Sequence, residues 1–157
     1  MLDILACRTP EDALVQFKIA LLKQQQHAEI LSAVAELTRL FAGSFKDAVP
    51  QLGTARTTLA RLIAKHLKTE EEELHAPLRA RRLTTQIPAF ADIAAETRDL
   101  RLAYSAHIGD WHARAVQADW SGYTGSARRL HAALERLTRR EEEEIYPAAQ
   151  WLLSELR

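Results

Sequence analysis

Histidine and glutamate side chains interrupt the apolar stripe of each helix that the sequence predicts. Five of them fall at three- and four-residue steps among leucines and other apolar residues: His27, His66, Glu70, His107 and Glu141. Buried ionisable groups are costly unless they are paired or bound to a metal. Imidazole nitrogen and carboxylate oxygen suit iron, manganese or zinc. The pattern therefore predicts a non-haem metal site, with a plain buried hydrogen-bond network as the alternative.

The heights of these residues along their helices decide whether they can meet. At about 1.5 Å per residue, His27 lies nearly as far before a turn near residue 48 as His66 and Glu70 lie after it. A second turn near residues 122 and 123 leaves His107 and Glu141 offset by roughly 5 Å, which helix tilt could absorb. We therefore expect the five side chains to converge.

Glycine and proline divide the chain into long segments that are rich in strong helix formers, and no segment alternates as a strand would. The expected helices run from Thr9 to near Gly43, over about 52–77, over about 90–118, and from about 126 onward, with Pro147 interrupting the last. Amphipathic helices joined by short turns predict an all-α fold. The expected architecture is one up-down-up-down four-helix bundle domain over 1–157.

Composition restricts the class of protein. The 157 residues include 21 Lys and Arg against 21 Asp and Glu, for a formal net charge of zero. Binders of nucleic acid or anionic membranes normally carry a positive charge, so neither partner is expected. The single Cys7 cannot form an internal disulfide, and neither a signal peptide nor a membrane span is expected. A cytoplasmic location is the resulting expectation.

The same segments resemble the hemerythrin-like domains with the His-His-Glu cation-binding pattern. The resemblance is carried by HAEIL from His27, HLKTEEEELHAP from His66, His107 with Ile108 and Trp111, and EEEEIYP from Glu141. An acidic run followed by proline occurs twice, over 70–77 and over 141–147. The resemblance covers nearly the whole chain.

This resemblance implies a hemerythrin-like four-helix bundle that binds iron, as one ion or as a diiron pair. His27, His66 and His107 would supply terminal imidazoles, and Glu70 and Glu141 bridging or terminal carboxylates. The implied function is oxygen, nitric oxide or redox sensing, or iron handling, with O2 or NO as ligand; a protein partner or a homodimer stays open. Substrate turnover is not indicated, although an oxidising enzyme that uses the same centre stays open.

One position departs from the family pattern. Leu137 stands four residues before Glu141, where the family has its last histidine, and it cannot bind a metal. The site could then hold one metal, an asymmetric pair completed by water, or none. Without metal, the chain would be a degenerate bundle that acts as a regulatory or protein-interaction module.

Two further polar positions are relevant to the site. His131 and Glu135 form a rival His-x3-Glu motif, but His131 is expected roughly 10 Å from the level of His107. Gln24 falls on the same stripe as His27 and is expected to be a hydrogen-bond partner rather than a ligand.

Overall fold

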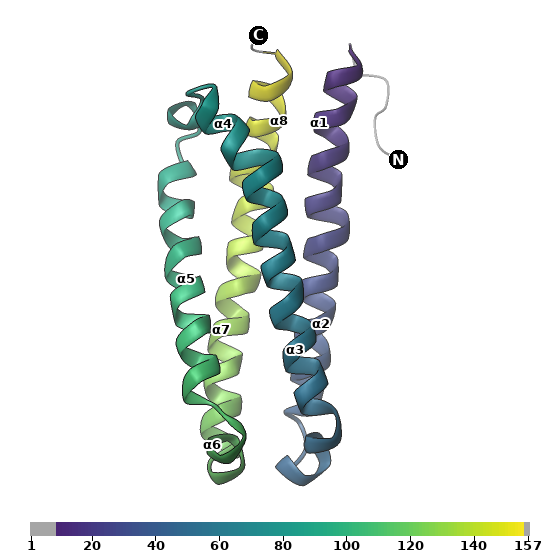
Figure 1. The fold of residues 1–157 in the computed structure, drawn as a ribbon, viewed down its shortest axis with the longest axis vertical. Helices are drawn as coiled ribbons and strands as arrows, with labels where there is room; N and C mark the ends of the chain where they lie inside the picture. The colour runs from purple at the N-terminus through teal and green to yellow at the C-terminus, as the bar shows by residue number, and fades with distance from the viewer. Residues whose placement is uncertain (1–8, 156–157) are drawn as a thin grey trace.

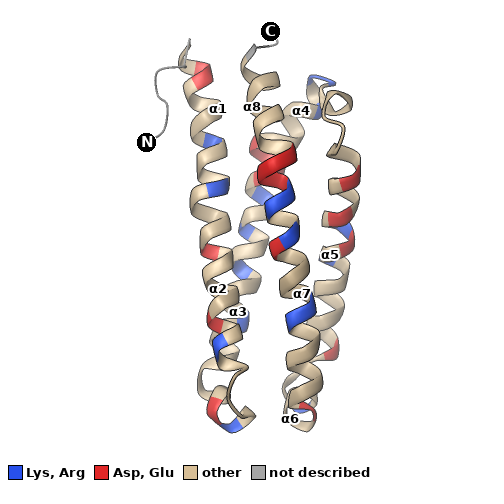
Figure 2. Ribbon diagram, turned by 180° about the vertical axis from the view of Figure 1, so that it is seen from behind, with Lys and Arg blue, Asp and Glu red and all other residues tan. Residues whose placement is uncertain are grey.

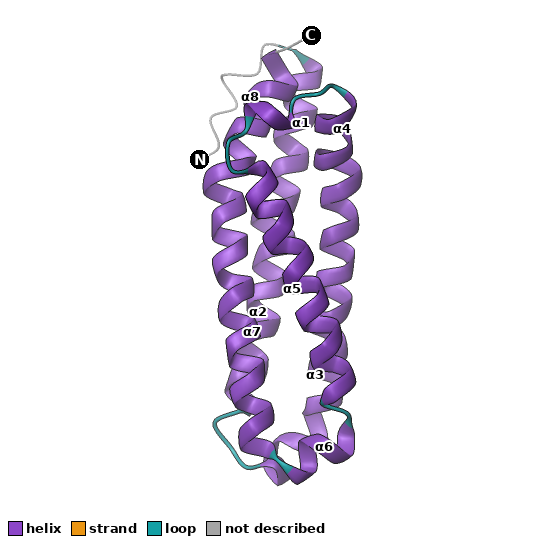
Figure 3. Cartoon of the chain, turned by 90° about the vertical axis from the view of Figure 1, so that its left-hand side faces the viewer, coloured by secondary structure: helices purple, strands orange, loops and turns teal. Residues whose placement is uncertain are grey.

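The chain is helical, and the computed structural model, which describes residues 9–155, contains no strand in that range (Figure 3). The elements are α1 (Pro10–Ala20), η2 (Leu21–His27), α2 (Ala28–Leu40), α3 (Phe45–Glu70), η3 (Glu71–His75), α4 (Ala76–Ala80), η4 (Thr84–Gln86), α5 (Phe90–Asp110), α6 (Ala113–Ala118), α7 (Trp120–Arg140), η5 (Glu141–Ile145) and α8 (Tyr146–Glu155). The all-α prediction is confirmed. Cys7 lies outside the described residues.

The longer helices lie side by side along one axis (Figure 1). In three places a π-helical turn, η2, η3 or η5, joins two α-helices without a break, which gives continuous runs over 10–40, 45–80 and 120–155. Helix α2 packs against α3, α5 against α7, and α1 against α8. None of the helices in the described range combines the length and apolar character needed to cross a lipid bilayer.

Helix α3 begins well before its predicted start near residue 52. Ser44 and Asp47 form a capping box: Ser44 Oγ accepts from the Asp47 backbone N–H at 3.3 Å, and the Ser44 N–H donates to Asp47 Oδ2 at 3.2 Å. Such a box satisfies backbone donors at a helix start. Pro50, treated in the sequence as a breaker, therefore lies inside the helix.

The helix predicted over 90–118 is two elements. Helix α5 ends at Asp110, and His112 caps the short α6 by accepting from the Ala115 backbone N–H at 3.4 Å. Helix α7 then begins at Trp120 rather than near 126. The connection between the two long helices is therefore centred several residues earlier than the sequence suggests.

The apolar core has two halves. One lies among α1, α4, α5 and α8 and includes Leu22, Leu78 and Leu152; the other lies among α2, α3 and α7 and includes Leu37 and Leu59. Six of the buried polar residues fall between these halves along the helices: Gln26, His27, His66, Glu70, Thr138 and Glu141. The two hydrophobic layers thus enclose one polar layer.

Candidate metal centre

The three π turns lie where the polar layer crosses the helices. His27 is the last residue of η2, Glu70 immediately precedes η3, and Glu141 opens η5. Turns of this kind often occur at functional sites. Pro77 and Pro147 each follow two residues after a π turn, and the helix continues through both. Since proline clashes with the carbonyl four residues earlier, a widened turn is a physical reason why Pro147 does not interrupt its helix.

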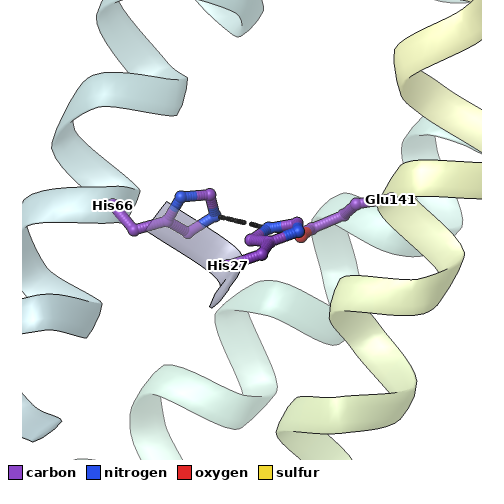
Figure 4. A group of neighbouring side chains, drawn as sticks. All are labelled: His27, His66 and Glu141. Carbon is purple, nitrogen blue, oxygen red and sulfur yellow. Dashed lines mark hydrogen bonds and ion pairs between the residues drawn. The ribbon is translucent and has the colours of Figure 1, made fainter. Parts of the chain in front are cut away.

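His27, His66 and Glu141 point toward one another in the middle of the core (Figure 4). The His27 Nε2 atom lies 3.1 Å from His66 Nε2 and 3.2 Å from Glu141 Oε2, and the remaining separation, His66 Nε2 to Glu141 Oε2, is 4.0 Å. Each residue is at most 5% exposed. Ligand atoms that share one ion at about 2.1 Å lie roughly 3 Å apart. The three side chains therefore have the spacing of a metal site.

Hydrogen bonds fix the orientation of the His66 ring. Thr69 Oγ1 donates to the Lys65 carbonyl at 2.9 Å, so the same oxygen accepts from Gln26 Nε2 at 3.1 Å. The Gln26 Oε1 atom then faces His66 Nδ1 at 3.0 Å and accepts its proton. Because a neutral imidazole carries one N–H, the lone pair of His66 is on Nε2 and faces His27 and Glu141.

The His27 ring is oriented in the same sense by a carboxylate. Its Nδ1 lies 2.8 Å from Glu142 Oε1, which can only accept when Glu142 is ionised. Metal-binding histidines commonly donate their other ring N–H to a carboxylate or carbonyl in this way. The sequence shows Glu142 only as one member of an acidic run, so its role was not predicted.

Glu70 joins the cluster through Tyr146. The Tyr146 hydroxyl donates to Glu70 Oε1 at 2.9 Å and lies 3.2 Å from His27 Nε2, while Glu70 Oε2 lies 3.8 Å from His66 Nε2. Burial and the nearby Glu141 raise the pKa of Glu70 well above its ordinary value. Burial likewise raises the pKa of Glu141. A bound cation would offset the cost of ionising both carboxylates.

Burial has the opposite effect on the imidazole. Desolvation, reinforced by the neighbouring His27, lowers the pKa of His66 to about 3. Histidine binds metal ions as the neutral imidazole. His66 is therefore already in the protonation state that coordination requires at neutral pH.

The structure places His107 away from the other predicted ligands. Its Nδ1 atom hydrogen-bonds with Ser126 Oγ at 3.0 Å, and its ring stacks on Tyr123 with centroids 5.6 Å apart. Because α5 ends earlier than predicted, His107 is near the connection to α7 rather than level with Glu141. The α5 residues that line a common cavity with Glu141 are Thr97, Leu100, Arg101 and Tyr104.

The predicted hydrogen-bond partner Gln24 is exposed, and the buried glutamine of this segment is Gln26. Phe17, expected on the same buried stripe, is 65% exposed, whereas Leu22 is buried. The π turn η2 accounts for both differences, because it inserts a residue relative to α-helical spacing and rotates the stripe that precedes His27.

Arg140 lies outside the buried cluster and connects the helices around it. Its guanidinium bonds Glu96 at 2.7 Å, Asp92 at 3.1 Å and Glu144 at 2.8 Å, which joins α5 to α7 and η5 beside Glu141. Figure 2 shows acidic and basic segments on the neighbouring ribbons of α5 and α7. These carboxylates raise the pKa of Arg140 above its ordinary value. The network fixes the start of η5 and hence the position of Glu141.

The rival motif is not assembled. His131 is buried, its ring stacks on Phe41 with centroids 5.9 Å apart, and its Nδ1 has no hydrogen-bond partner in the described range. Glu135 is exposed. At 1.5 Å per residue, His131 lies roughly 15 Å along α7 from Glu141. Burial lowers the pKa of His131 to about 4.

Replacing His131 by leucine is expected to stabilise the fold by about 1–2 kcal/mol at neutral pH, because it removes an unpaired buried nitrogen. The folded-state pKa of about 4 lies below the ordinary 6.5, so the contribution of neutral His131 is complete above pH 6.5 and is lost as the pH falls toward 4. The advantage of His131→Leu should therefore grow between pH 6.5 and 4 in urea unfolding.

His131→Gln provides the matched control. It keeps a polar group at the same place but cannot titrate, so it should lose the part of the pH dependence that comes from His131 without the gain at neutral pH. If both variants kept the wild-type pH dependence, His131 would not be the titrating group.

Comparison with protein-family models, with curated proteins and with solved structures gives no match. The geometry of the described residues therefore carries the functional argument by itself.

Proposed function

We propose that this protein is a hemerythrin-like metal-binding protein, with iron as the first choice, that serves O2, NO or redox sensing or iron handling. The proposed architecture is an up-down-up-down four-helix bundle made of the runs 10–40, 45–80, 90–110 and 120–155. Their side-by-side packing along one axis and the polar layer between two apolar layers support this arrangement.

The observation that carries the proposal is the meeting of two Nε2 atoms with a carboxylate oxygen. The Nδ1 atoms of His27 and His66 are occupied by Glu142 and Gln26, so both Nε2 atoms present lone pairs at a separation of 3.1 Å. Lone pairs this close repel unless they share a cation with Glu141. That cation is either a proton or a metal ion. The buried carboxylates favour the metal ion, because it carries the greater positive charge.

The donor set narrows the choice of metal. Two imidazoles and one carboxylate, with further positions open, are typical of non-haem ferrous sites. His27, His66 and Glu141 would hold the ion, and Glu70 is close enough to be a further ligand. The bound metal would supply Lewis acidity or a redox couple. Tyr146 would hold a proton between Glu70 and the centre.

The test is the metal content of the purified chain. The protein is stripped with a chelator, loaded anaerobically with ferrous iron, desalted and measured by elemental analysis and by its absorption spectrum in air. We expect about one iron per chain with a near-ultraviolet charge-transfer band. A content near two would indicate a diiron centre, and a chain that retains no metal would contradict the proposal.

A second candidate function is a metal-free module with a regulatory or protein-interaction role. The observation that favours it is Leu137, which is 4% exposed and packed in the core at the position where the family has a ligand. In this case a proton shared by His27, His66 and Glu141 would complete the hydrogen-bond network. Removal of metal would then leave the stability unchanged.

A further inference from the structure

An apolar groove of about 410 Å³ runs between α3 and α5. Small-molecule sites in proteins have volumes of roughly 300–1,000 Å³, so the groove is large enough for a ligand. Its walls include Ala60 and Ala64 from α3 and Leu102 and Ile108 from α5. Leu102 is 65% exposed and Ile108 47% exposed, so both present apolar surface to solvent at the groove.

Positive charge is concentrated toward one end of this groove. Arg98 and Arg101 line it, and none of its lining residues is acidic. Within the described range, Arg101 makes no hydrogen bond or ion pair, and Arg98 contacts only its sequence neighbour Asp99, at 3.6 Å. Along α5, Arg98 and Arg101 come before the exposed apolar side chains of Leu102 and Ile108. The groove is therefore positively charged toward one end and apolar toward the other.

The groove borders an inner cavity. Four residues line both the groove and this cavity of about 40 Å³: Ile63, Leu67, Arg101 and Tyr104. That cavity is otherwise mostly apolar and reaches His66 and Glu141. The shared side chains thus stand between the groove at the surface and the cavity beside the polar cluster.

We propose that the groove between α3 and α5 binds a small organic acid with an apolar body, such as a medium-chain fatty acid. Its carboxylate would pair with Arg101 and Arg98, and its chain would lie against Ala64 and Leu102 toward Ile108. The stretch from Arg101 to Ile108 covers about 10 Å at 1.5 Å per residue, which matches an extended octanoate. Binding depends on the groove alone and therefore goes beyond the proposed metal function.

The charge pattern selects this occupant over others. An isolated guanidinium prefers a planar carboxylate, which it can bind with two parallel hydrogen bonds. The apolar walls favour a hydrocarbon body, and burying it removes Leu102 and Ile108 from water. A neutral hydrocarbon would leave Arg101 unpaired, and a small polar anion would leave the apolar walls exposed.

The experiment is calorimetric titration of octanoate into chelator-treated protein, so that it does not depend on the metal centre. We expect saturable binding that Arg101→Gln weakens about tenfold and that Ala64→Trp, which fills the groove, abolishes. Octanamide, which lacks the charge, should bind about tenfold more weakly. Arg114→Gln removes an arginine that is also exposed, from α6 outside the groove, and should bind as the wild type does.

Several results would overturn the proposal. They are absence of octanoate binding, equal binding of octanoate and octanamide, and binding that survives both Arg101→Gln and Ala64→Trp. A dimer in sedimentation that Ala64→Trp dissociates would instead assign the groove to a second copy of the chain. If Ala64→Trp fails to fold, the proposal is still tested by comparing Arg101→Gln with the wild type and octanamide with octanoate. Octanoate binding by a chain that takes up no iron would leave this site intact while contradicting the metal centre.

Discussion

Replacing His66 by alanine is expected to abolish iron retention, with affinity reduced by more than about 100-fold. Loss of a supporting residue around a metal ligand already weakens binding by about 10–100-fold, and His66 is proposed as a ligand itself. The His66 ring offers one of the three potential ligand atoms that lie together, and the other two come from His27 and Glu141. The measurement is elemental analysis after anaerobic loading, together with a competition titration against a chelator of known affinity.

His131→Ala is the matched control, because it removes another buried imidazole from the same core. It should retain iron nearly as the wild type does. Circular dichroism must show both variants folded, since His66→Ala also leaves Gln26 without its donor, at a cost of about 1–3 kcal/mol. Iron retained by folded His66→Ala, or lost from His131→Ala, would mean that the metal is bound elsewhere.

Removal of metal is expected to lower the melting temperature by about 10 °C. An ion present at a thousand times its dissociation constant stabilises the folded state by about 4 kcal/mol, and each kcal/mol corresponds to about 2–4 °C for a domain of this size. Differential scanning calorimetry of loaded and chelator-treated protein measures the shift. The effect should be large because the ion would join helices that are far apart in the sequence.

Glu141→Gln serves as the control for this experiment. It is close in shape to glutamate but lacks the carboxylate that faces His27 and His66. Its melting temperature should respond little to the chelator. A wild-type melting temperature that does not change on chelation would instead support the metal-free module.

Residue counting along straight helices was sufficient to bring three of the predicted ligands together. His27, His66 and Glu141 meet, although the turn between α2 and α3 spans 41–44 and lies several residues before the expected centre near residue 48. The two acidic runs, over 70–77 and 141–147, also begin at the level of the buried polar layer in both halves of the chain. The buried layer could thus be located from the periodicity of the polar residues and from the acidic runs, whereas the expected turn positions were wrong by several residues.

Counting failed where the helices depart from regular geometry. His107 was placed by assuming one helix through 90–118, whereas α5 ends at Asp110 and a separate short helix follows. Gln26 and Tyr146 were missed because the π turns change the helical phase beside them. Such turns leave no reliable signal in composition, although the proline that follows η5 is consistent with one.

At the π turns, the number of residues in the turn matters for the fold as well as the identity of their side chains. A π turn holds one residue more than an α-helical turn, and each α-helical residue advances by about 100° around the axis, so winding the same residues as a regular α-helix would rotate everything beyond the turn by about that angle. Tyr146 and Leu152, now buried, would leave the core. The four consecutive glutamates, which look interchangeable, therefore lie in a turn whose π geometry accommodates one additional residue and so keeps the C-terminal helix in phase with the core.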